Sequence, residues 1–210
     1  MRKSLVIITA AMVIAIFLCS SVFASPTFVP VPDLDKYLTP DNMAKLEAGE
    51  VVKENIMEKN ADGSDSGRAV ALIIINAPKD RIMAELAKYE TYPQWMPSTK
   101  KTTVVSRSDT ASSVEFELSI LGATVNYTVI HKIDKAKGTI QWRMDDSKPK
   151  KNVKDSVGAW VLKAHGDKTI IAYTVQVDTG VSVPKFIQKW LSNTSLKKVL
   201  KAVKKQVEKE

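Results

Sequence analysis

The sequence VEFELSILGATVNYTVIHKI, residues 114–133, carries the strongest indication of how this chain folds. Apolar side chains alternate with polar ones through most of it, which is typical of a strand with one dry face and one solvated face. Gly122 interrupts the alternation and indicates a bend or a bulge. Further strands, separated by turn residues, are predicted at 68–76, 101–108, 140–144, 158–164 and 169–178. Together these runs predict an antiparallel sheet.

The end of the chain predicts the cover for that sheet. An amphipathic helix is expected from Val183-Pro184 onward, with Asn193-Thr194-Ser195 as a kink or a brief loop. Its apolar stripe consists of Phe186, Ile187, Trp190, Leu191, Leu196, Val199, Leu200, Val203 and Val207. Strands with one apolar face need an element that covers this face, and no other predicted element is long enough to cover the sheet. We therefore expect an α+β fold in which a curved antiparallel sheet of about seven strands wraps around this long C-terminal helix.

Residues 1–24 have the layout of a secretory signal peptide. Two basic residues precede an apolar run from Leu5 to Leu18, and Val22-Phe23-Ala24 supplies the small or branched residues of a cleavage site. The apolar run is shorter than the ~20 residues that span a bilayer, which favours cleavage after Ala24 over retention as an anchor. We therefore expect a periplasmic protein.

The rest of the chain predicts a leader followed by one domain. Residues 25–67 begin with a proline-rich extended stretch and hold one short helix, which Thr39 caps and Gly49 ends. Residues 68–210 contain the predicted strands and are numerous enough to bury a hydrophobic core without disulfides or a structural metal. The single cysteine, Cys19, lies in the signal segment, so the mature chain has neither a disulfide nor a reactive thiol.

Several segments resemble the helix-grip (SRPBCC) superfamily of START domains, polyketide cyclases and aromatases, and ubiquinone-binding START-like proteins. IINAPKDRI (74–82) and LAKYETYPQWMP (86–97) resemble its first strand, the helix that follows and its Y-x-x-Y-P-x-W/F-x-P connection. VGAWVL (157–162) and VPKFI (183–187) resemble a later strand and the start of the C-terminal helix. The resemblance implies a START-like domain over 68–210, nearest to the ubiquinone-binding branch. It leaves the activity open, because the superfamily hosts carriers, cyclases, quinone binders and hydrolases.

The inward side chains of such a sheet either fill a solid core or surround a cavity, and the resemblance favours the cavity. The residues expected to line it are Phe116, Leu118, Tyr127, Val129, His131, Trp142, Met144, Trp160, Tyr173, Phe186 and Trp190. The resemblance places Tyr92, Trp95 and Met96 at its mouth, where they either control access or plug the end of the core. We expect an exported protein that binds or carries a hydrophobic small molecule (a lipid, quinone or polycyclic) and needs no cofactor.

His131 is the one candidate for catalysis. Imidazole titrates in the range that suits proton transfer, and Tyr127 or Tyr173 is expected to lie near it. The alternative to binding is therefore a cyclase- or hydrolase-type enzyme that uses His131 with a tyrosine. Against this, the sequence has no nucleophile elbow, no phosphate loop and no cluster with metal-ligand spacing. The pattern favours binding over catalysis and predicts no metal site.

Basic residues are in excess, with a net charge of +8, and they crowd the last turns of the chain. These residues are Lys197, Lys198, Lys201, Lys204 and Lys205. Since no aromatic residue lies among them and arginine is scarce, nucleic-acid binding is not expected. The lysines form either a solvated helix face or a surface that contacts anionic lipid headgroups transiently.

Overall fold

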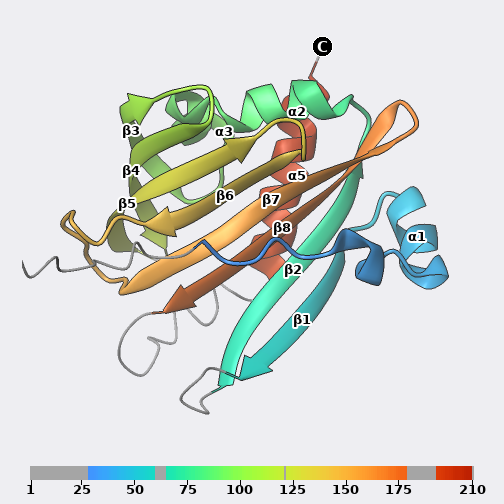
Figure 1. Ribbon diagram of the computed structural model, residues 1–210, viewed down its shortest axis with the longest axis horizontal. Helices are drawn as coiled ribbons and strands as arrows, with labels where there is room; N and C mark the ends of the chain where they lie inside the picture. Colours follow the sequence, from blue (N-terminus) through green and yellow to red (C-terminus); the bar gives the residue numbers. More distant parts are fainter. Residues whose placement is uncertain (1–27, 60–64, 121, 179–192, 210) are drawn as a thin grey trace, which may run out of the picture.

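The computed structural model describes residues 28–59, 65–120, 122–178 and 193–209. Its centre is one antiparallel sheet of eight strands in the order β1-β2-β8-β7-β6-β5-β4-β3 (Figure 1). The strands are β1 (Val52–Lys59), β2 (Asp65–Ile75), β3 (Thr99–Arg107), β4 (Ala111–Ile120), β5 (Ala123–Asp134), β6 (Thr139–Met144), β7 (Asp155–His165) and β8 (Lys168–Asp178). The predicted helix-grip class is confirmed. The sheet has one strand more than the expected number of about seven.

The extra strand lies in the segment that was predicted to be a leader. β1 falls wholly within residues 25–67 and pairs with β2 along its length. The sheet therefore begins before the expected domain start at residue 68. The short helix of the leader forms as predicted, as α1 (Pro40–Glu47). The hydroxyl of Thr39 accepts a hydrogen bond from the backbone N–H of Asn42 at 3.3 Å, which caps that helix.

One face of the sheet is covered by α5 (Asn193–Val207) and α2 (Lys79–Leu86), which both lie behind the sheet in Figure 1. The buried stripe of α5 includes Leu196, Leu200 and Val203, and it packs into the main core with β2 and β8. α5 begins at the polar triplet that was predicted to be a kink or a loop. The first half of the predicted helix lies outside the described residues. No described helix is long and apolar enough to span a bilayer.

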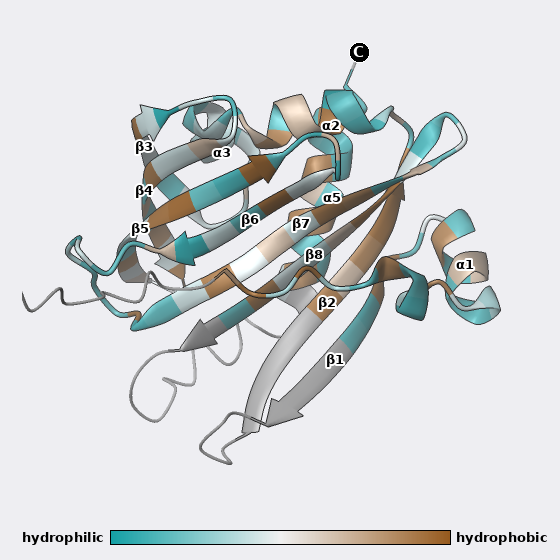
Figure 2. Cartoon of the chain, viewed as in Figure 1, coloured by the Kyte–Doolittle hydropathy of each residue, from teal (hydrophilic) through white to brown (hydrophobic). Residues whose placement is uncertain are grey.

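The opposite face of the sheet is covered by the leader, which crosses in front of it in Figure 1. Residues of η1 (Leu34–Tyr37) and α1 bury Leu34 and Leu46 against β2, β7 and β8, which forms a second apolar cluster. β2 is consequently buried on both faces, and its sequence VALIII (70–75) is continuously apolar rather than alternating. Figure 2 shows this part of β2 in brown. This second core was not predicted from the sequence.

The predicted helix that follows the first strand of the resemblance is divided in the structure. α2 ends at Leu86, and a short 3-10 turn, η2 (Tyr89–Thr91), leads into α3 (Tyr92–Trp95). The hydroxyl of Tyr92 donates a hydrogen bond to the carbonyl of Leu86 at 2.6 Å. A carbonyl at the end of a helix needs such a partner, because no further N–H of the helix reaches it. The division turns Tyr89 inward, where it is 2% exposed.

The break in alternation at Gly122 is a turn between two strands. β4 ends at Ile120, β5 begins at Ala123, and Gly122 adopts a φ of +85°. Glycine adopts this left-handed conformation without the steric cost that a Cβ would bring. The turn sets the register in which Phe116 lies opposite Tyr127, two residues of the site described next.

Candidate functional site

A cavity lies between the α5 side of the sheet and the α3 segment. The space between its walls amounts to about 670 Å³, a volume that includes solvent outside the cavity proper. Its described lining residues are Tyr92, Met96, Pro97, Thr99, Phe116, Leu118, Tyr127, Val129, His131, Trp142, Ser156, Trp160, Tyr173, Val175 and Val199. None of these residues is Asp, Glu, Lys or Arg. An apolar space with a few uncharged polar groups is what a small-molecule site requires.

Strand register places the aromatic walls of the cavity. Phe116 lies opposite Tyr127, and their rings stack with centroids 5.8 Å apart and planes at 16°. Trp160 lies opposite Tyr173, and these ring centroids are 4.3 Å apart. Cross-strand aromatic pairs stabilise a sheet and limit the positions of their rings. The hydrogen bonds of the strands therefore hold the walls in place.

Gly158 of β7 makes room for a third aromatic side chain, Trp142. Trp142 is its register partner on β6, and its ring stacks on Tyr173 with centroids 5.6 Å apart. A Cβ on residue 158 would lie 2.2 Å from Cζ2 of Trp142 and 2.3 Å from the carbonyl oxygen of Thr174. The missing side chain thus allows the indole to approach the backbone of β7.

The structure brings most of the predicted site residues together around the cavity. These are Phe116, Leu118, Tyr127, Val129, His131, Trp142, Trp160 and Tyr173, with Tyr92 and Met96 from the predicted mouth. Met144 is 1% exposed and is enclosed in the main core, and it does not border the cavity. Trp95 packs edge-on against Tyr92, with ring centroids 5.0 Å apart, and it is also absent from the described lining of the cavity. Phe186 and Trp190 lie outside the described residues.

Sequence reasoning missed three hydroxyl-bearing residues at or beside the cavity. Thr99 and Ser156 line it, and Ser112 lies 3.4 Å from His131. Ser112 and Ser156 occupy inward positions of the strand alternation, two residues before Val114 and Gly158. Alternation alone could have found them. They were passed over because small polar side chains do not strengthen an apolar pattern.

His131 is held from two directions. Its ring stacks on Tyr89 with centroids 4.4 Å apart, and its Nδ1 lies 3.4 Å from the hydroxyl oxygen of Ser112. Burial lowers the pKa of His131 to about 3, because the charged form would lose its hydration. The imidazole is therefore neutral at physiological pH. A base with so low a pKa is poorly matched to proton transfer near pH 7.

Tyr127 and Tyr173 are the two other tyrosines, besides Tyr92, that line the cavity. Burial raises the pKa of both hydroxyls well above the ordinary value, so both stay protonated. Neither hydroxyl has a hydrogen-bond partner among the described residues. The polar atoms of two other lining residues are already engaged, since the Tyr92 hydroxyl binds Leu86 and the indole N–H of Trp142 lies 3.5 Å from Ser156 Oγ.

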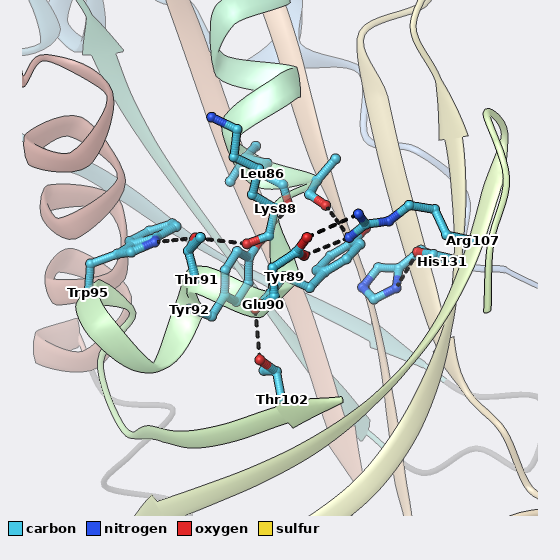
Figure 3. A network of polar contacts seen from close by, with 12 residues as sticks. Leu86, Lys88, Tyr89, Glu90, Thr91, Tyr92, Trp95, Thr102, Arg107 and His131 are labelled. Carbon is cyan, nitrogen blue, oxygen red and sulfur yellow. Dashed lines mark hydrogen bonds and ion pairs between the residues drawn. The ribbon is translucent and has the colours of Figure 1, made fainter. Parts of the chain in front are cut away.

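Polar contacts hold the segment that contributes Tyr92 and Met96 to the cavity lining (Figure 3). The indole N–H of Trp95 donates to the hydroxyl of Thr91 at 3.0 Å, and that hydroxyl donates to the carbonyl of Lys88 at 2.8 Å. The hydroxyl of Thr102, on β3, donates to the carbonyl of Tyr89 at 2.8 Å. These bonds fix η2 and α3 to the edge of the sheet.

Arg107 adds an ion pair on the outer side of the same segment (Figure 3). Its two terminal nitrogens donate to both carboxylate oxygens of Glu90, at 3.1 and 2.7 Å, and one also donates to the carbonyl of Ala87 at 3.1 Å. The guanidinium lowers the pKa of the Glu90 carboxyl. Bidentate geometry makes this pair more specific than most surface ion pairs. No cluster of three or more possible metal ligands occurs in the part of the chain that the structure describes.

Comparisons with known proteins agree with this architecture. Residues 67–208 match the family described as polyketide cyclase / dehydrase and lipid transport. No curated protein matches the chain.

Solved structures resemble the chain across the same fold. A STAR-related lipid transfer protein fragment from Xanthomonas axonopodis has a TM-score of 0.60 at 17% identity, covering 74% of this chain and 99% of that one. A START superfamily protein from Mycobacterium smegmatis has a TM-score of 0.58 at 18% identity, covering 67% and 97%. Human STARD10 has a TM-score of 0.58 at 14% identity, covering 87% and 82%. At these identities the likeness establishes the fold alone.

Proposed function

This chain belongs to the polyketide cyclase / dehydrase and lipid transport family, and we propose that it binds or carries a hydrophobic small molecule in the cavity beneath α5. The observation that carries the proposal is the composition of the cavity. Its walls are aromatic and aliphatic, its described lining has no charged side chain, and its one histidine is neutral. Such a space gains free energy by excluding water around an apolar ligand.

The test is native mass spectrometry and solvent extraction of the protein purified from its own cells. An apolar molecule should co-purify in stoichiometric amount. Leu118→Lys should abolish its retention, because the substitution brings a charge into the cavity wall. Glu117→Lys is the matched control, since the neighbouring residue lies on the opposite face of β4, and it should retain the ligand. An empty protein, or equal retention by both variants, would contradict the proposal.

The same extract bears on the identity of the ligand. The resemblance to the ubiquinone-binding branch makes a quinone one proposed occupant, beside a lipid or a polycyclic compound. A quinone would be recognised by its redox-dependent absorbance and its mass. An extract that holds only acylglycerols or phospholipids would remove the quinone from consideration and leave the binding function intact.

The enzymatic alternative is a cyclase- or hydrolase-type reaction that uses His131 with Tyr127 or Tyr173. The family description includes cyclases, but the low pKa of His131 disfavours it as a proton acceptor. His131→Gln keeps a hydrogen-bonding side chain and removes the titrating group. Loss of turnover of a candidate substrate with unchanged ligand retention would favour catalysis over binding.

We also propose that the chain is exported to the periplasm and cleaved after Ala24. The support is the signal-peptide layout of residues 1–24, which lie outside the described residues. The mature protein in the periplasmic fraction should begin at Ser25. Recovery of full-length chain in the cytoplasmic fraction would contradict the proposal.

A transient contact with an anionic membrane surface is the last part of the proposed function. Lys197, Lys198, Lys201 and Lys205 are exposed on the side of α5 that faces away from the core, and none forms an ion pair within the described residues. Lys204 is different, because it donates to the carbonyl of Ile74 at 2.9 Å and pairs with Glu208. Near an anionic surface each free lysine is worth about 1 kcal/mol.

Vesicles of phosphatidylglycerol and phosphatidylcholine provide the test of this contact. Changing the four free lysines to Gln should abolish co-sedimentation with the vesicles at low salt. Changing Lys100, Lys101, Lys132 and Lys135 to Gln removes the same charge elsewhere and should leave it nearly unchanged. Equal effects of the two sets would mean that net charge, and not the helix face, causes the attraction.

A further inference from the structure

Two tyrosine hydroxyls in the cavity lack partners of their own. Tyr127 and Tyr173 both line the cavity, and neither hydroxyl is hydrogen-bonded within the described residues. Their apolar surroundings deprive the hydroxyls of much of their hydration. A polar group in such surroundings costs free energy unless it finds a partner, and native proteins rarely leave one unpaired. The partner is therefore expected from whatever fills the cavity.

Tyr127 and Tyr173 border one cavity although their strands are not neighbours. Tyr127 is on β5 and Tyr173 is on β8, with β6 and β7 between them. The sheet therefore brings two tyrosines to a single ligand space. A polar group on a ligand that occupies this space would lie in a cavity that both side chains border.

The described lining of the cavity has no charged side chain that could balance a charge on a ligand. Its one imidazole is neutral, with Nδ1 already beside Ser112. A carboxylate or an ammonium group would lose its hydration without gaining a counter-charge, which costs far more than burying a neutral oxygen. A hydroxyl, carbonyl or ether oxygen has no such penalty.

We propose that Tyr127 and Tyr173 determine specificity, by binding a neutral oxygen of an otherwise apolar ligand and so selecting it over both a plain hydrocarbon and a carboxylate. The proposal rests on the proposed binding function, because it names the chemistry recognised at that same site. The tyrosines act through direct hydrogen bonds to the ligand. Their aromatic rings contribute apolar surface to every ligand alike.

Three probes with one carbon skeleton test the proposal: naphthalene, 2-naphthol and 2-naphthoate. Protein stripped of co-purified molecules by unfolding and refolding is examined by equilibrium dialysis at pH 7, with chromatographic measurement of each probe. The wild-type protein should bind 2-naphthol about tenfold more tightly than naphthalene, the effect of about 1.4 kcal/mol. It should bind 2-naphthoate at least tenfold more weakly than 2-naphthol. Tyr127→Phe combined with Tyr173→Phe should bring 2-naphthol to within twofold of naphthalene.

Tyr89→Phe is the matched control. It removes the hydroxyl of a buried tyrosine that does not belong to the described lining of the cavity. It should leave the preference for 2-naphthol unchanged. Equal wild-type affinity for naphthalene and 2-naphthol, or a preference that survives the double substitution, would overturn the proposed selectivity while the binding function stands. Failure of all three probes to bind would refute the binding function and this inference with it.

Discussion

Replacing Gly158 with alanine should lower both the stability of the fold and the affinity of the cavity for a ligand. The new Cβ would lie 2.2 and 2.5 Å from Cζ2 and Cη2 of Trp142, and 2.3 Å from the carbonyl oxygen of Thr174. The indole can rotate away, but the carbonyl belongs to β8 and can move only with its strand. Overpacking of this kind costs about 1–3 kcal/mol, and the backbone clash puts this case near the upper end. For a chain of this size we expect a melting temperature about 6–10 °C lower.

The assay is thermal unfolding by circular dichroism, combined with binding of 2-naphthol. Because Trp142 lines the cavity, displacement of its indole should lower the affinity for the probe together with stability. Gly166→Ala is the control: Gly166 lies in the turn between β7 and β8, at φ +63°, and nothing lies within 4 Å of its added Cβ. It should cost about 1 kcal/mol and leave binding unchanged. A Gly158→Ala protein that melts within 2 °C of wild type and binds normally would refute the packing described for Trp142.

Two further predictions follow from burial. The pKa of His131 is lowered to about 3 in the folded chain and is near 6.5 in the unfolded chain. As the pH falls, the unfolded state therefore binds the extra proton first. This protonation lowers the free energy of unfolding by about 1.4 kcal/mol per pH unit between about pH 6 and pH 4. Urea titrations of His131→Phe should lack that component of the slope, and a slope equal to wild type would show that the imidazole is not buried neutral. Leu46→Ala, 1% exposed in the second core, should lower the free energy of unfolding by about 3 kcal/mol. Glu47→Gln is the control, because it breaks only the exposed 2.6 Å contact with His165, and it should lower the free energy of unfolding by less than about 0.5 kcal/mol. Similar losses for both variants would mean that ion pairs, and not apolar contacts, hold the leader on the sheet.

The strands and the helices were largely predictable, because each is set by a local pattern. Alternation from Val114 to Ile133 assigned an inner and an outer face, and the structure places Val114, Leu118 and Val129 inside. The Thr39 cap was predictable for the same reason, since it depends on residues three apart in the chain. The role of β2 in two cores escaped prediction, because a strand covered on both faces loses its alternation. β1 escaped prediction because its sequence, VKENIMEK, has no regular alternation of apolar and polar residues.

The sequence by itself determined the fold class and the set of side chains that could face inward, because periodicity and turn residues act over a few neighbours. Only the tertiary structure decided which inward residues border empty space. Met144 and Trp142 both alternate inward on β6, yet Met144 is enclosed in the core while Trp142 lies over Gly158 and lines the cavity. The presence of Tyr127 and Tyr173 at one cavity, and the burial that keeps His131 neutral, depend on how the sheet is arranged and on contacts between residues far apart in the chain. Such contacts leave no periodic trace in the sequence, because they depend on how complete strands are positioned against one another.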